Sequence, residues 1–179
     1  MAQSLRFALW NANGLGKHCQ EVKTFIKNQS IDIMLVSETH FTNWTHFKIP
    51  HYDIYDTKHP DGTAHGGTAI VIRSSLKHHE LSNYKTNHIQ ATSIVIEDWI
   101  GPITISSIYS PPRHSISDEQ YERFFNTLGN RFIAGGDYNA KHTNIQRLTN
   151  QKGRALAKTI KAKKFIICQL ANLLSGPLI

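Results

Sequence analysis

Short apolar runs separated by polar turns make up most of the first 140 residues of this chain. The run 31–37 (IDIMLVS) is almost continuously apolar, as is typical of a strand buried on both faces. Further short runs, most of them rich in β-branched residues, also predict strands. They lie at 5–10, 68–73, 91–97, 103–109 and 131–136.

Three segments carry helical patterns. Residues 18–29 place Val22, Phe25 and Ile26 on one face. Ser117, followed by acidic residues, predicts an N-cap and a helix that continues to about Leu128. Residues 152–164 predict a basic helix. Many strands and few helices favour an α+β domain with packed β-sheets over a regular alternation of strands and helices.

The length of 179 residues suits one domain, and no repeat or Gly/Ser linker divides it, so we expect a single domain over 1–179. No apolar stretch reaches the roughly 20 residues of a membrane span, and the first residues lack a signal-peptide pattern. The only cysteines, Cys19 and Cys168, form no CxxC pair. We therefore expect no membrane association, no disulfide framework and no zinc site.

Positive charge is concentrated at one end of the sequence. Of the 20 Lys and Arg residues, eight lie in 141–179, which has no Asp or Glu; the rest of the chain has twelve basic and thirteen acidic residues. A basic region attracts a polyanion, most often nucleic acid. A solvated helical face explains the charge equally well.

Polar clusters follow four of the predicted strands. They are 11–14 (NANG), 37–40 (SETH), 109–112 (YSPP) and 136–139 (GDYN). Each cluster alone is a weak signal, because Asn-Gly is usually a turn and a Glu at a strand end is usually solvated. Strand ends at one sheet edge can, however, bring side chains together from distant positions.

Together the four clusters supply what phosphodiester cleavage needs. Glu38 suits a hard cation such as Mg²⁺, with Asn11 orienting it or completing the shell. Asp137 suits the deprotonation or alignment of the attacking water. Asn139 and Tyr109 could donate hydrogen bonds to phosphate oxygens as negative charge builds up.

Several other features have two interpretations each. Gly135-Gly136 either leaves room for a phosphate or ends a strand, and Gly66-Gly67 indicates a turn or a close backbone approach. The pair His78-His79 is expected to be ordinary surface histidine in a polar loop. Trp44 is expected to pack at the core or rim, although its loop could touch DNA.

Four sequence motifs, in this order, resemble those of the exonuclease–endonuclease–phosphatase superfamily: WNANGL, SETH, IYSPP and GGDYNAKH. The sequence is most similar to the endonuclease domain of LINE-type, jockey-like non-LTR retrotransposons, over about residues 5–160. The resemblance implies two packed β-sheets flanked by helices, a four-layer αββα sandwich. It also implies a Mg²⁺- or Mn²⁺-dependent domain that nicks double-stranded DNA and precedes a fused reverse transcriptase, which the nick primes.

The resemblance also implies residue roles. Asn11 and Glu38 match the active-site Asn and the metal-ligand Glu, and His40 matches a nearby position. Tyr109 matches a Tyr at the scissile phosphate, while Asp137 and Asn139 match the Asp that activates the nucleophile and its partner. Four cations in the basic region are candidates for DNA contacts: Lys141, Arg147, Lys152 and Arg154.

This sequence departs from the family after Asp137. Relatives continue with a further Asp-containing strand and a final Ser-Asp-His motif, and neither occurs in residues 1–179. A truncated element copy, a misjoined gene prediction or a shortened fragment would each explain this. We expect exposed sheet edges and little or no nuclease activity.

The alternative function is a non-catalytic DNA-binding remnant. A phosphatase acting on sugars or lipids is a third possibility, against which the basic region and the SETH and GDYNAKH motifs argue. A chromosomal substrate would imply the nucleus. The sequence indicates neither the oligomeric state nor the target sequence.

Overall fold

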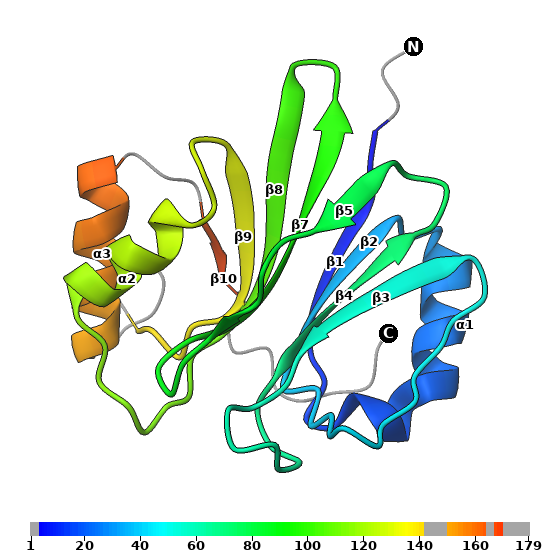
Figure 1. The fold of residues 1–179 in the computed structure, drawn as a ribbon, viewed down its shortest axis with the longest axis horizontal. Helices are drawn as coiled ribbons and strands as arrows, with labels where there is room; N and C mark the ends of the chain where they lie inside the picture. The colour runs from blue at the N-terminus through cyan, green and yellow to red at the C-terminus, as the bar shows by residue number, and fades with distance from the viewer. Residues whose placement is uncertain (1–3, 142–149, 164–166, 170–179) are drawn as a thin grey trace.

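The computed structural model describes residues 4–141, 150–163 and 167–169. Two β-sheets pack face to face, with helices on both outer sides (Figure 1). The first sheet has the strand order β1-β2-β4-β3 and the second the order β10-β9-β8-β7-β5, with β6 paired to β7. Helix α1 covers the first sheet, and α2 and α3 cover the second (Figure 1). This four-layer α+β sandwich confirms the predicted fold class.

Strands of the first sheet agree closely with the sequence pattern. They are β1 (Phe7–Asn11), β2 (Ile33–Ser37), β3 (Tyr52–Thr57) and β4 (Thr68–Arg73). Every residue of β2 is buried, as its continuous apolar run predicts. β1 runs parallel to β2, and β4 runs antiparallel to both β2 and β3. Strand β3 has no counterpart among the predicted strands.

The second sheet is built around a long hairpin. Its strands are β5 (His78–Glu80), β6 (Tyr84–Lys85), β7 (Gln90–Asp98), β8 (Gly101–Tyr109), β9 (Phe132–Asp137) and β10 (Ile167–Gln169). β9 pairs in parallel with β8 on one side and with β10 on the other. Strand β10 covers the edge of β9 and is itself the edge strand on that side of the sheet.

Three helices and one 3₁₀ turn complete the described fold. They are η1 (Leu15–His18), α1 (Cys19–Gln29), α2 (Asp118–Asn126) and α3 (Gln151–Lys163). Ser117 caps α2 as predicted, since its hydroxyl accepts from the Gln120 N–H while the Gln120 side chain accepts from the Ser117 N–H. No helix in the described residues is long and apolar enough to cross a membrane.

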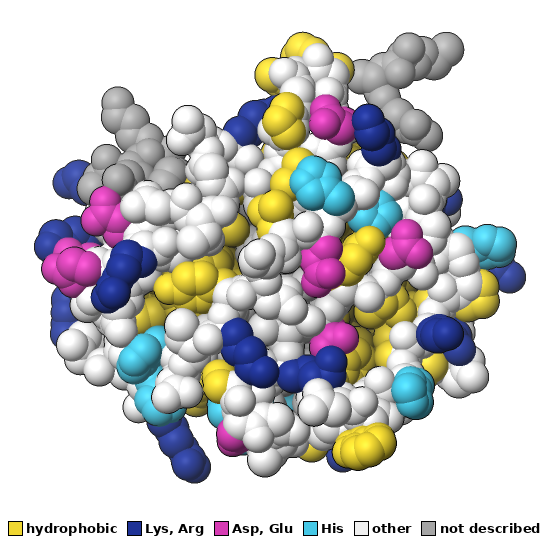
Figure 2. All heavy atoms as spheres, in the orientation of Figure 1, with side chains coloured by type: hydrophobic (Ala, Val, Ile, Leu, Met, Phe, Trp, Pro, Cys, Tyr) yellow, Lys and Arg dark blue, Asp and Glu magenta, His cyan; other side chains and the backbone are white. Residues whose placement is uncertain are grey.

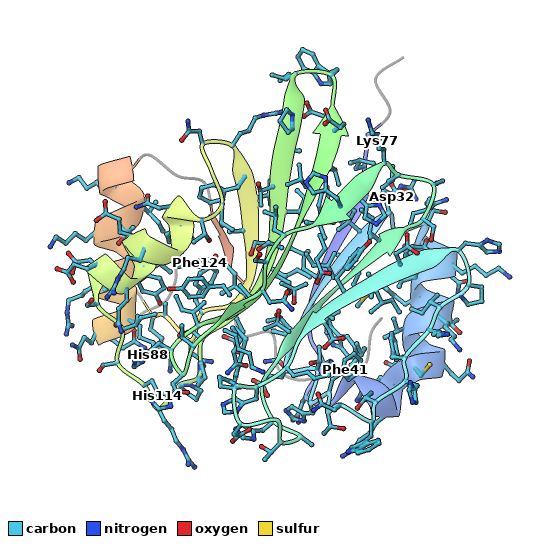
Figure 3. The ribbon with its side chains drawn as sticks, in the orientation of Figure 1. Asp32, Phe41, Lys77, His88, His114 and Phe124 are labelled. Atoms are coloured by element: carbon cyan, nitrogen blue, oxygen red, sulfur yellow. The ribbon has the colours of Figure 1, made fainter. Side chains whose placement is uncertain are left out.

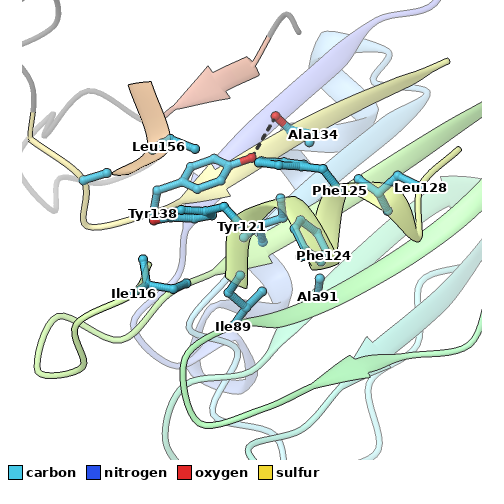
Figure 4. Close-up of a cluster of buried hydrophobic side chains, with 12 residues drawn as sticks. Ile89, Ala91, Ile116, Tyr121, Phe124, Phe125, Leu128, Ala134, Tyr138 and Leu156 are labelled. Carbon is cyan, nitrogen blue, oxygen red and sulfur yellow. Dashed lines mark hydrogen bonds between the residues drawn. The ribbon is translucent and has the colours of Figure 1, made fainter. Parts of the chain in front are cut away.

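Each gap between layers holds an apolar cluster. Between the sheets, alternate residues of β2 and β4 meet β7 and β8; the buried members are Ile33, Leu35, Ile70, Ile72, Ile94, Ile96 and Ile105. The other faces of β2 and β4 pack on α1. The third cluster lies under α2 and α3, where Tyr121, Phe124, Phe125 and Tyr138 pack together (Figure 4). This packing holds the strand ends in fixed positions.

One surface expectation is corrected by the fold. The pair His78-His79 lies on β5, and not in a loop. The His78 side chain is 5% exposed and lies against Tyr55, whose hydroxyl is 3.1 Å from His78 Nε2. His79 points outward and is exposed, as expected. Burial of His78 follows from the pleat, which turns neighbouring side chains to opposite faces.

Candidate active site

The candidate site lies where four strands end on the same side of the sandwich. Asn11 ends β1 and Glu38 follows β2, while Tyr109 and Asp137 end β8 and β9. Register pairs Tyr109 with Asp137 across the parallel strands of the second sheet. Because β1 and β2 also run parallel, their ends meet at the same edge of the first sheet. The strand ends that carry Asn11, Glu38, Tyr109 and Asp137 are called the rim below.

Asn11 joins the two sheets at this rim. Its side-chain Nδ2 donates to Glu38 Oε1 at 2.9 Å and to Asp137 Oδ2 at 3.1 Å. Its Oδ1 accepts from the backbone N–H of Asn13 at 3.1 Å. One amide thus holds two carboxylates that come from different sheets.

Backbone hydrogen bonds fix the loops that carry these side chains. Gly14 N donates to the Glu38 carbonyl at 2.8 Å, and His40 N donates to the Gly66 carbonyl at 2.9 Å. Glu38 and His40 have φ values of 54° and 55°, in the left-handed region. Such conformations in non-glycine residues are uncommon and are found mostly where the surroundings enforce them.

His40 lies beside Glu38 at the edge of the rim. Its Nε2 is 3.7 Å from Glu38 Oε2, and its side chain is 27% exposed. This places the imidazole next to the carboxylate oxygen that Asn11 does not contact. A catalytic role for His40 stays a prediction.

Burial and nearby charges shift the pKa values of Tyr109 and Asp137. Burial raises the pKa of the Tyr109 hydroxyl above its usual range, and the charges of Glu38 and Asp137 raise it further. The phenol therefore stays protonated at neutral pH and can donate a hydrogen bond. Burial is also the main cause that raises the pKa of Asp137, with Glu38 adding to it; hydrogen bonds from Asn139 and Asn11 act in the opposite direction.

Asn139 serves partly as a brace for the loops. Its backbone N–H donates to Asp137 Oδ1 at 2.9 Å, and its side-chain Nδ2 donates to the Ser110 carbonyl at 3.1 Å. Its φ of 47° turns the chain sharply after β9. The backbone N–H of Asn139 thereby orients Asp137, and its side-chain amide connects the end of β9 to the end of β8.

The glycine before Asp137 is required by backbone packing. A Cβ on Gly136 would lie 1.9 Å from the Ile108 carbonyl oxygen, and its φ is 152°. Of the two interpretations of Gly135-Gly136, close packing against β8 therefore accounts for Gly136.

The four predicted DNA contacts divide into different environments. Lys141 and Arg154 are exposed, and Arg147 lies outside the described residues. Lys152 is 4% exposed, and its Nζ donates to Ser110 Oγ at 2.8 Å and to the Pro111 carbonyl. Its position corrects the expectation of a surface cation, because a turn of α3 directs it inward. Burial lowers its pKa to about 8, and Asp137 opposes that shift.

Asn150 is a structural residue that the sequence pattern did not single out. Its Oδ1 accepts from Gly153 N at 2.8 Å and from Lys141 N at 3.0 Å, and its Nδ2 donates to the Asn139 carbonyl. Asn150 thus caps α3 and anchors it to the loop after Asp137. A signal for this role exists, since an Asn directly before a helical pattern is a typical N-cap.

Trp44 departs from expectation as well. Instead of packing at the core or rim, it is 87% exposed in the loop that follows Glu38. Its neighbours Phe41 and Phe47 pack against each other. The exposed indole is therefore available to a ligand at this end of the molecule.

The paired sheets and the carboxylate rim define a four-layer α+β sandwich with a polar site at its strand ends. The chain belongs to the Endonuclease/Exonuclease/phosphatase family, whose sequence profile matches residues 8–176. Its homologues are proteins of jockey-type and X-element non-LTR retrotransposons.

Among these relatives is the RNA-directed DNA polymerase from mobile element jockey of Drosophila melanogaster, 38% identical over 139 residues. That alignment covers 78% of this chain and 15% of the relative. The probable RNA-directed DNA polymerase from transposon X-element of the same species is 35% identical over 159 residues, or 87% of this chain and 17% of the relative. The chain thus spans about a sixth of these relatives.

Solved structures share the fold. The endonuclease domain of TRAS1, a telomere-specific non-LTR retrotransposon, matches with a TM-score of 0.69 and 23% identity, covering 89% of this chain and 72% of that domain. The AP endonuclease LMAP from Leishmania major matches with a TM-score of 0.71 and 15% identity, covering 89% and 66%.

Proposed function

We propose that this domain is a divalent-metal-dependent endonuclease that nicks double-stranded DNA, so that the freed 3′-hydroxyl primes reverse transcription by a fused reverse transcriptase. The observation that carries the proposal is the bridge from Asn11 to both Glu38 and Asp137. The proteins named above as RNA-directed DNA polymerases support the link to reverse transcription. A chromosomal substrate would place the protein in the nucleus.

The rim fits a hard divalent cation. Two carboxylates, Glu38 and Asp137, share one amide, and the charge of Glu38 adds to the burial that raises the pKa of Asp137. Carboxylate oxygens are the donors that Mg²⁺ and Mn²⁺ prefer. Glu38 would hold the ion, which would offset negative charge on the phosphate. The side-chain N–H groups of Asn11 point to both carboxylates, so in this orientation Asn11 positions Glu38. Direct ligation of the metal ion by Asn11 stays a prediction.

The other rim residues have complementary tasks in the proposed reaction. Asp137, held by Asn11 and Asn139, would align or deprotonate the attacking water. The protonated Tyr109 would donate to a phosphate oxygen as charge develops there. The side-chain amide of Asn139 would also donate to a phosphate oxygen, in place of its present hydrogen bond to the Ser110 carbonyl.

We further propose that this chain alone is weakly active or inactive. Within the described residues, the side chain of Asp137 is held by Asn11 and by the Asn139 backbone, and no histidine contacts it. An aspartate without an imidazole partner lacks the group that most often transfers protons near neutral pH.

The test is a single-turnover assay with supercoiled plasmid, excess protein and Mg²⁺. We expect slow conversion to the open circle, lost in Glu38→Gln and in Asp137→Asn. If the unchanged chain nicks no faster than Glu38→Gln yet still binds DNA, the non-catalytic DNA-binding alternative is correct. Rapid multiple turnover would instead refute the weak activity. A parallel assay with a soluble phosphomonoester separates a phosphatase from a nuclease.

A further inference from the structure

The loop between β3 and β4, residues 58–67, brings two imidazoles and a carboxylate together. In His59, Asp61 and His65, one ligand atom from each side chain lies within 4.8 Å of the other two. Within the described residues this is the one group of at least three His, Cys, Asp or Glu side chains that meets such a distance.

Asp61 lies between the two rings. Its Oδ1 is 2.7 Å from His59 Nδ1, and its Oδ2 is 3.6 Å from His65 Nε2. The ring centroids of His59 and His65 are 3.7 Å apart. Each carboxylate oxygen therefore faces a different imidazole nitrogen, so the three side chains present donor atoms to one common place.

Hydrogen bonds within the loop orient these donors. Asp61 Oδ1 accepts from the Thr63 N–H and from the Thr63 hydroxyl, each at 2.9 Å. The Thr63 hydroxyl also contacts His65 Nδ1, which leaves Nε2 of that ring facing Asp61. A second partner on the far nitrogen is the usual way in which proteins orient a ligating histidine.

The ends of the loop are anchored in the fold. Gly67 N donates to the buried Gln90 Oε1 at 2.6 Å, and the Gly66 carbonyl accepts from His40 N. A Cβ on Gly66 would lie 2.7 Å from Gln90 Oε1 and 3.1 Å from Tyr109 Cε1. The His59 side chain is only 14% exposed, so its ring has little freedom to turn away. The end of the loop and the His59 ring are thus held by the fold, while Thr63 orients the more exposed Asp61 and His65.

Charge favours a cation at this place. The backbone N–H of Thr63 is the main cause that holds the pKa of the Asp61 carboxyl below its usual range, and His59 contributes.

We propose that His59, Asp61 and His65 form a binding site for a divalent transition-metal ion of the Zn²⁺ type, separate from the site at Glu38. Two imidazole nitrogens and one carboxylate oxygen suit Zn²⁺, with a fourth position left for water. Mg²⁺ takes oxygen ligands and is poorly served by this set. The expectation of no zinc site rested on cysteine spacing, which does not register a His-Asp-His loop.

The position of the loop gives the ion a structural effect. Thr57 and Ser37 both pair with Thr68, so the loop leaves the sheet beside Glu38. An ion held by three loop residues would stabilise this segment against His40 and Tyr109. It need take no part in the reaction, and its presence can be measured without activity.

The test uses the whole chain and ZnCl₂ alone. We expect Zn²⁺ to raise the melting temperature of the unchanged chain and of Glu38→Gln. His65→Asn should bind Zn²⁺ about tenfold or more weakly by calorimetric titration. The matched control is His79→Asn, an exposed histidine on β5, which should behave as the unchanged chain.

Two further measurements keep the result decisive. Circular dichroism checks that His65→Asn, altered at an exposed side chain, is folded; Asp61→Asn is the second variant. Co²⁺ as a probe should give a visible absorption band that both loop variants lose and His79→Asn keeps. Equal Zn²⁺ affinity in the unchanged chain, His65→Asn and Asp61→Asn would overturn the proposal, as would no Zn²⁺ binding at all.

Discussion

Asn11 and Asp137 are 126 positions apart in the sequence, and their side chains are joined by a hydrogen bond of 3.1 Å. The first residue ends β1 in one sheet and the second ends β9 in the other. Because the same Asn11 amide also donates to Glu38, the two sheets meet at a pair of carboxylates. This relationship is the basis of the proposed metal site.

Replacing Asn11 with leucine should destabilise the fold. Leucine has a similar size but no donor, so Glu38 and Asp137 would face each other without their shared hydrogen bonds. We expect a loss of about 1–3 kcal/mol in the free energy of unfolding, measured by urea denaturation. The control is Asn43→Leu, an exposed asparagine in the loop after Glu38, which should change stability little. Equal losses for the two variants would contradict this prediction.

The glycine before Asp137 gives a second test. Gly136→Ala would push a Cβ into the Ile108 carbonyl, so we expect a loss of about 3 kcal/mol or more in the free energy of unfolding. Gly129→Ala is matched, because its φ of 77° is also positive but nothing lies within 4 Å of the added atom. It should cost only about 1–2 kcal/mol. If Gly136→Ala were the milder variant, the close packing of β9 on β8 would be wrong.

Lys152 predicts a pH dependence of stability. Its pKa is about 8 in the folded chain, against 10.5 for an unperturbed lysine, so between these pH values the unfolded chain binds more protons. Stability from this group is therefore fully present above the unfolded pKa and is lost as the pH falls through 8. Relative to Lys152→Met, the unchanged chain should gain stability from about pH 7.5 to about pH 9.5 in urea denaturation. A difference in unfolding free energy between the two chains that does not change with pH would refute a buried Lys152 with a lowered pKa.

DNA binding should depend strongly on salt. Lys and Arg side chains lie over α2 and α3, with Asp and Glu among them (Figure 2). Lys141, which follows β9, and Arg154, near the start of α3, are both exposed. We expect the double variant Lys141→Ala, Arg154→Ala to lower the slope of log affinity against log salt by about 2. Lys77→Ala is the control, since Lys77 lies in the upper part of the view and Phe41, three residues after Glu38, lies in the lower part (Figure 3). An unchanged slope in the double variant would place the DNA elsewhere.

Much of the fold follows from local pattern. The continuous apolar run of β2 and the Ser117 cap of α2 could be predicted because each depends on neighbouring residues alone. Strand β3, with the sequence YDIYDT, could not, because its apolar residues do not alternate regularly and three of its six residues are polar. It forms a strand because β4 offers it a full row of backbone partners.

The candidate site was predictable in position but not in detail. Polar residues at the ends of apolar runs indicated where side chains would converge. That Lys152 turns inward to Ser110 depends on where the start of α3 lies relative to the end of β8, which no local pattern encodes. The grouping of His59 and His65 around Asp61 likewise depends on the turn at Thr63.

The proposed metal site at the rim can be tested by Mn²⁺ binding, followed by electron paramagnetic resonance. His65→Asn serves as the parent chain, so that the histidine loop does not contribute. We expect one Mn²⁺ site in this parent, weakened about tenfold or more when Glu38→Gln is added. Equal Mn²⁺ affinity with and without Glu38→Gln would contradict a metal site held by Glu38.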